Sequence, residues 1–150
     1  MARWKSYFSL KGRASRLAFW RFFLLQSLAA AAILVTTSFA TIIGGWLGVV
    51  PALFIAPLLA AAFCMTVRRL HDRGKGMAWA VIFTFGPFLL GAPLRLIARE
   101  ASVAVVLTAS LAALAGGVLA LWSWVELGGL RGQKGPNRYG PAPRGVAARS

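Results

Sequence analysis

The fold is decided by an uncharged run of 46 residues, Phe22–Val67, which reads FFLLQSLAAAAILVTTSFATIIGGWLGVVPALFIAPLLAAAFCMTV. Its first part, Phe22–Ile43, has 22 residues. A helix of that length spans roughly 33 Å, enough to cross a bilayer core of about 30 Å. Gly44-Gly45 then interrupts the run, and Trp46–Val67 supplies a second stretch of the same length. The pattern predicts a hairpin of two transmembrane helices with almost no loop.

Two more uncharged stretches follow, at residues 76–94 and 101–125. The first is short and broken by Gly86-Pro87 and Ala92-Pro93, so a bent or re-entrant segment is the alternative to a full span. The second is rich in Ala and long enough to cross. We therefore expect an all-α membrane protein with four transmembrane helices, near 22–43, 46–67, 76–94 and 101–125.

The composition agrees with a membrane protein and excludes other classes. The 150 residues are 59% hydrophobic and 13% charged, whereas soluble domains are about 45–50% apolar and about 25% charged. A soluble domain of this size has too little interior to bury so much uncharged sequence. This excludes a soluble globular enzyme, a disordered chain and a disulfide-stapled secreted domain.

Basic residues set the expected orientation. Fifteen of the 17 Lys and Arg residues lie in the N-terminal segment 1–21, the central block 68–75 and the tail from 126 to 150, and only two lie in the turn 95–100. By the positive-inside rule, both termini and the central block should be cytoplasmic. Residues 1–21 mix basic and aromatic side chains, as interfacial segments do. The Gly- and Pro-rich composition of 126–150 is typical of a flexible, basic tail.

The sequence offers little chemistry. No ionisable side chain lies within the predicted spans, which argues against a proton or ion pump. Cys64 is alone, without His or Cys at ligand spacing, so we expect no metal and no cofactor. No nucleic-acid-binding motif accompanies the net charge of +14, so anionic lipid is a better partner for it than nucleic acid. We expect the hydroxyls of Thr36, Thr37, Ser38 and Thr41 to bond within their own helix or to bridge to a neighbouring helix rather than line a pore.

The central block, RRLHDRGK at Arg68–Lys75, is the most informative polar segment. Asp72 is one of only three acids, and we expect it to pair with Arg13 or Arg16, tying this block to the N-terminal segment. His71 could act as an acid or base oriented by Asp72, although no nucleophile or metal partner is visible. Arginines at headgroup level could also bind a lipid phosphate. The candidate lipid or partner cluster comprises Arg13, Arg16, Arg68, Arg69, His71, Asp72, Arg73, Asn137, Arg138 and Tyr139.

Three segments in order carry a resemblance: YFSLKGRASRLAFW at Tyr7–Trp20, VRRLHDRGK at Val67–Lys75 and GPNRYGPAP at Gly135–Pro143. Together they resemble the bacterial inner-membrane proteins grouped as domain of unknown function 805, and the resemblance covers nearly the whole chain. It implies a small polytopic protein of the bacterial cytoplasmic membrane with no established activity, and it supplies no catalytic or binding residues to carry over. We expect the three segments to meet on the cytoplasmic side, with the turn at Asn137–Tyr139 folding back over the central block.

The expected function is that of a non-enzymatic membrane protein whose basic cytoplasmic face binds anionic lipid or a membrane protein partner, with a homo-oligomer as a further option. Two alternatives stay open from the sequence. One is a small transporter or channel subunit that uses the proline-containing second and third spans. The other is an enzyme that acts on a lipid headgroup through His71 and Asp72.

Overall fold

The computed structural model describes residues 8–96 and 102–143, and within them all the regular elements are helices. The only β-type pairing in these residues is an isolated bridge between Asn137 and Gly140. The elements are α1 (Arg16–Gly44), η2 (Gly45–Gly48), α2 (Val49–Ala52), α3 (Ile55–Asp72), α4 (Met77–Leu96), α5 (Val103–Trp124) and a π-helical turn η3 (Val125–Gly129). The predicted all-α membrane fold is confirmed.

The first hairpin consists of α1 and the returning helices α2 and α3. Ser15 begins α1 because its side chain accepts a hydrogen bond from the Ala18 N–H, and Gly45, with φ of +45°, ends it. The sequence predicts one span for the returning chain, and in the structure this span is interrupted between α2 and α3. Pro57 explains the break, because proline has no N–H and its ring clashes with the carbonyl four residues earlier, here that of Leu53.

The second hairpin consists of α4 and α5, which pack along each other. In α4, Pro87 and Pro93 lie inside one helix. Gly116 allows α5 to approach α4 closely, because a Cβ at this position would lie 3.1 Å from the Pro87 carbonyl oxygen. Three helical stretches are long and apolar enough to cross a membrane, Arg16–Gly44, Val49–Asp72 and Val103–Gly129, while the apolar part of α4, Met77–Pro93, is shorter.

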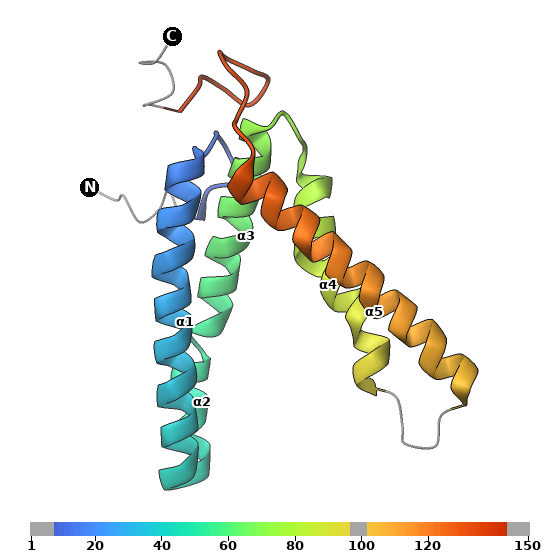
Figure 1. Ribbon diagram of the computed structural model, residues 1–150. Helices are drawn as coiled ribbons and strands as arrows, with labels where there is room; N and C mark the ends of the chain where they lie inside the picture. The colour runs from blue at the N-terminus through green and yellow to red at the C-terminus, as the bar shows by residue number, and fades with distance from the viewer. Residues whose placement is uncertain (1–7, 97–101, 144–150) are drawn as a thin grey trace.

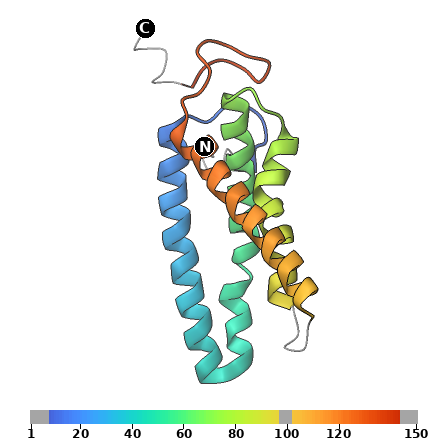
Figure 2. The ribbon, with the colours of Figure 1, turned by 45° about the vertical axis from the view of Figure 1, so that its right-hand side comes forward.

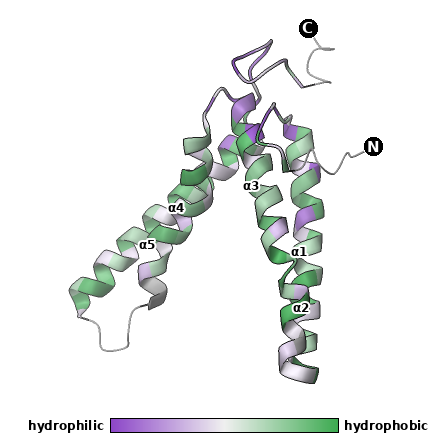
Figure 3. Cartoon of the chain, turned by 180° about the vertical axis from the view of Figure 1, so that it is seen from behind, coloured by the Kyte–Doolittle hydropathy of each residue, from purple (hydrophilic) through white to green (hydrophobic). Residues whose placement is uncertain are grey.

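The two hairpins meet at one end and diverge toward the other (Figure 1; Figure 2 shows the same arrangement turned by 45°). The small hydrophobic core lies where they meet and contains Val67, Leu70, Ala80, Phe83 and Leu127. Polar residues concentrate at this same end, and the diverging helices are mostly apolar (Figure 3). None of the residues of α1 is buried, as expected for a helix whose sides face lipid.

Three expected boundaries differ from the structure. Residues 16–21, predicted as part of an interfacial segment, form the start of α1, and α3 continues five residues past Val67 to Asp72. From residue 126 we expected a flexible tail, but up to residue 143 the chain packs back on the end of the helices, and Glu126 is only 3% exposed. The reason is a set of long-range polar contacts, described next. Residues 1–7 and 144–150 lie outside the described part.

Candidate functional site

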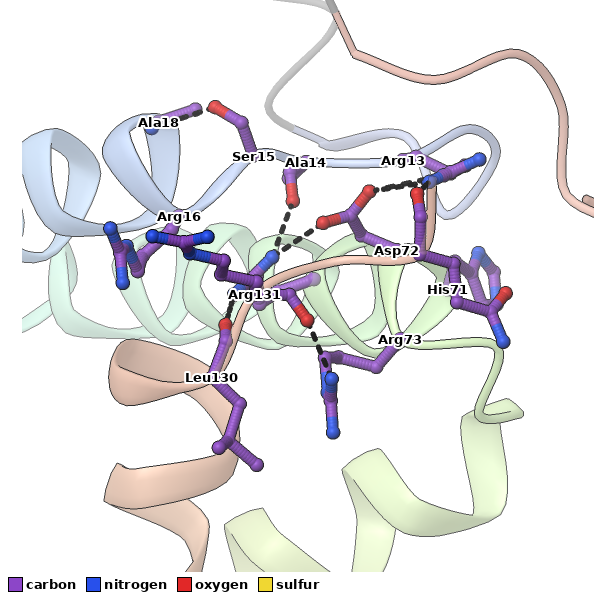
Figure 4. A network of polar contacts seen from close by, with 12 residues as sticks. Arg13, Ala14, Ser15, Arg16, Ala18, His71, Asp72, Arg73, Leu130 and Arg131 are labelled. Atoms are coloured by element: carbon purple, nitrogen blue, oxygen red, sulfur yellow. Dashed lines mark hydrogen bonds and ion pairs between the residues drawn. The ribbon is translucent and has the colours of Figure 1, made fainter. Parts of the chain in front are cut away.

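Asp72 lies where three distant segments meet. It is the last residue of α3 and is 2% exposed. Its Oδ1 accepts a hydrogen bond of 3.0 Å from Arg13 Nε, and its Oδ2 accepts one of 2.5 Å from Arg69 Nη1. Figure 4 shows Arg13 and Asp72 facing each other. Of the two expected partners, Arg13 forms the ion pair, while Arg16 binds elsewhere.

Backbone contacts bring the N-terminal segment to this position. The Ala14 N–H donates to the Arg68 carbonyl at 3.0 Å, and the Ala14 carbonyl accepts from Arg69 Nη1 at 3.4 Å. A backbone carbonyl has two lone pairs, so the Arg68 carbonyl near the end of α3 can accept this bond in addition to one within the helix. The basic residue Arg68 thereby positions Ala14 through its backbone, and its side chain is half-buried.

The residues Leu130–Pro143, here called the C-terminal strap, satisfy the two buried arginines. Arg13 donates to the carbonyls of Gln133 and Gly135, each at 2.6 Å, and Arg69 donates to that of Leu130. The Gln133 N–H in turn donates to the Asp72 carbonyl at 2.8 Å. A buried guanidinium needs acceptors for its N–H groups, and one carboxylate cannot supply them all. The strap's carbonyls therefore complete the cluster.

Side chains from α1 and α3 cap the end of the last helix. The carbonyls of Leu127, Gly128 and Gly129 accept from Arg69 Nε, Trp20 Nε1 and Arg16 Nη1 at 2.7, 3.0 and 3.1 Å. Helix C-termini present unpartnered carbonyls and a partial negative charge, which cations stabilise. These contacts join the two hairpins through the end of the fourth apolar stretch.

A second acid forms its own cluster beside the first. Glu126 Oε1 lies 3.0 Å from Arg73 Nε and 3.1 Å from Lys75 Nζ. The ammonium of Lys75 also lies 4.7 Å from the centroid of the Trp79 ring and 5.5 Å from that of Trp122. Of these three residues, only Arg73 belongs to the candidate cluster predicted from the sequence. The available signal was the rarity of acids, since Glu126 is one of only three.

His71 does not pair with Asp72. Its Nδ1 lies 3.2 Å from the Gly12 carbonyl oxygen, and its ring stacks on Tyr139 with centroids 3.8 Å apart. The proposed acid–base pair is thus wrong, because both carboxylate oxygens of Asp72 are taken by Arg13 and Arg69. The alternative of an enzyme that acts on a lipid headgroup required Asp72 to orient His71, and the structure does not show this contact.

The turn at Asn137–Tyr139 folds over the central block, as the sequence analysis expected. Asn137 Nδ2 donates to the His71 carbonyl at 2.9 Å, and Asn137 Oδ1 accepts from the Tyr139 N–H at the same distance. The guanidinium of Arg138 lies 4.7 Å from the centroid of the Tyr139 ring. The three residues hold the strap against the end of α3, which gives them a structural role.

Hydroxyls inside the first helix bond locally. The Thr36 hydroxyl donates to the Ala32 carbonyl at 2.8 Å and that of Thr41 to the Thr37 carbonyl at 2.7 Å. This agrees with the expectation for Thr36 and Thr41, whereas the buried hydroxyl of Thr37 has no hydrogen-bond partner among the described residues.

The outside of this end is basic. Asp72 and Glu126, the acids in the described part of the chain, are 2% and 3% exposed and are consumed by internal pairs. Around them lie exposed basic residues, namely Lys11, Arg16, Arg21, Arg131, Lys134 and Arg138. The described surface at this end therefore presents positive charge without exposed carboxylates.

Comparisons with known proteins agree with this picture. The family described as "Protein of unknown function (DUF805)" matches residues 7–141. The chain is 33% identical over 85 residues to Inner membrane protein YhaI of Escherichia coli strain K12, covering 57% of this chain and 69% of the relative, and equally to YhaI of strain O157:H7. No solved structure matches. Together with the long apolar helices, the comparisons identify a multi-pass inner-membrane protein. The chain belongs to the DUF805 family of proteins of unknown function.

Proposed function

We propose that this chain is a non-enzymatic inner-membrane protein whose cytoplasmic end binds anionic phospholipid. The observation that supports it is the contrast between buried acids and exposed bases at the end where the hairpins meet. Asp72 and Glu126 form ion pairs inside the protein. The outer surface is therefore positively charged and should attract anionic headgroups. Each Lys or Arg near an anionic membrane surface contributes about 1 kcal/mol.

The aromatic residues support a position at headgroup level. Trp79 and Trp122 pack around Lys75. Trp20, near the start of α1, packs against Trp124, the last residue of α5. Indole rings favour the membrane–water boundary. The basic surface should therefore lie among lipid headgroups, on the cytoplasmic side by the positive-inside rule.

The proposal is tested by tryptophan quenching in bilayers. The full-length protein is reconstituted with brominated phosphatidylglycerol or brominated phosphatidylcholine, which quench indoles in direct contact. We expect stronger quenching by the anionic lipid, and a preference that falls at high salt because exposed charges are screened.

The variants neutralise exposed bases that have no part in the buried clusters. The triple variant Lys11→Gln, Arg131→Gln, Lys134→Gln removes three of the six exposed basic residues in the described part of the chain and should lose about half of the preference, up to about 3 kcal/mol at low salt. The matched control, Lys11→Arg, Arg131→Lys, Lys134→Arg, keeps the charge and should keep the preference. Equal quenching by the two lipids in the wild-type protein would show that the proposal is wrong.

A further inference from the structure

A cavity of about 190 Å³ lies just below the charged cluster, between α1, α3 and the end of α5. Aromatic side chains of α1, including Phe19 and Phe23, form one wall, Ala62 and Met65 of α3 form another, and Trp124 closes the third side. Apolar cavities of about 150 Å³ accept guests the size of benzene. This one is larger, and it opens on the molecule's surface.

One hydrogen bond and two aromatic contacts fix the positions of the helices that form the walls. The cavity therefore does not depend on a ligand to form. Trp20 Nε1 donates to the Gly128 carbonyl, which fixes the top of α1 against η3. The rings of Trp20 and Phe23 meet that of Trp124 edge to face, with centroids 5.9 and 5.1 Å apart. Such aromatic contacts have preferred geometries and resist collapse.

Arg16 lies on α1 just before the first residues that line this cavity and is not itself part of the lining. It precedes Phe19 and Trp20 by one helical turn, and its Nη1 reaches across to the Gly129 carbonyl, so the guanidinium lies between α1 and η3. The side chain is exposed, and one hydrogen bond uses one of its five N–H donors. The remaining donors match the oxygens of a phosphate group, which guanidinium binds in a bidentate manner.

We propose that this cavity is a discrete phospholipid site, in which one acyl chain of an anionic glycerophospholipid enters between α1, α3 and α5 and its phosphate lies against Arg16. The inference rests on the proposed function, since both concern anionic lipid. It adds a single site with defined stoichiometry to a diffuse basic surface. The Arg16 guanidinium above the cavity and a mainly apolar lining, whose polar members are Gln26, Thr66 and Ser123, match the two parts of such a lipid.

The test is native mass spectrometry of the full-length protein after reconstitution in vesicles of phosphatidylglycerol and phosphatidylethanolamine. Two variants address the two halves of the site. Ala62→Phe fills the cavity, and Arg16→Gln removes the charge above it. Each has a matched control: Ala60→Phe changes an exposed alanine of α3, and Arg21→Gln removes an exposed charge about 140° around α1 from Arg16.

We expect the wild-type protein and both controls to retain one phosphatidylglycerol, and Ala62→Phe and Arg16→Gln to retain it at least tenfold less. Thermal unfolding of each variant establishes that the fold is intact, and Arg16→Lys should restore part of the retention. If all folded variants retain lipid alike, the discrete site is wrong while the basic surface still stands. If the wild-type protein retains no phosphatidylglycerol and shows no quenching preference for it, both proposals fail. Retention of a protein or peptide in place of lipid would likewise overturn the site.

Discussion

Replacing Asp72 by Asn should destabilise the protein by about 3–5 kcal/mol, the usual cost of removing one partner of a buried ion pair. The carboxylate holds two guanidinium groups, at 3.0 Å from Arg13 and 2.5 Å from Arg69, and all three side chains are at most 3% exposed. Asn removes both attractions and leaves two like charges facing each other. The backbone carbonyls that also bind these arginines remain, so we expect the lower part of that range.

The measurement is the free energy of unfolding in mixed micelles, followed by tryptophan fluorescence as SDS is added. A double-mutant cycle with Arg13→Gln isolates the pair, and contacting residues typically show coupling of about 0.5–3 kcal/mol. A change below about 0.5 kcal/mol for Asp72→Asn, or additive effects in the cycle, would refute the reasoning that this pair holds the N-terminal segment on α3.

Three further predictions follow from the same contacts. Gly128→Ala should cost about 1–3 kcal/mol because its Cβ would lie 2.7 Å from the Trp20 ring, whereas Gly129→Ala, with its closest contact at 3.9 Å, should be tolerated; SDS unfolding compares the two. Ending the chain after residue 129 should lower the melting temperature, because Arg13 and Arg69 lose strap carbonyls, while ending it after residue 143 leaves all these contacts in place. A membrane-impermeant thiol reagent should label Lys134→Cys only in inverted vesicles and Trp46→Cys only from outside intact cells; the reverse would invert the orientation.

The sequence predicts the helices and one of the key contacts well. Uncharged runs and the Gly44-Gly45 break are local signals of apolar helices and their ends, and they locate the first hairpin. The rarity of acids singles out Asp72, and its surplus of basic neighbours predicts an arginine partner. The sequence could not show that α3 runs on to Asp72, because charged residues are typical of both a loop and a helix end at the membrane boundary.

The strap and the Glu126 cluster depend on contacts that local composition does not encode. Gly- and Pro-rich segments bury little apolar surface and are usually disordered. Here the order comes in large part from the Arg13 guanidinium, more than 100 positions away in the chain, which binds the backbone carbonyls of Gln133 and Gly135. Backbone acceptors are the same for every residue type, so no sequence pattern marks them.

The most direct test of the central claim, that three distant segments form one ordered cluster completed by the strap, is amide hydrogen exchange over residues 128–143. The amides of Leu130, Gln133 and Gly140 donate to carbonyls at 3.0, 2.8 and 2.9 Å. We predict slow exchange for these amides in the wild-type protein and fast exchange in Asp72→Asn, with the helices of both hairpins still protected. Fast exchange throughout the strap of the wild-type protein would contradict the account.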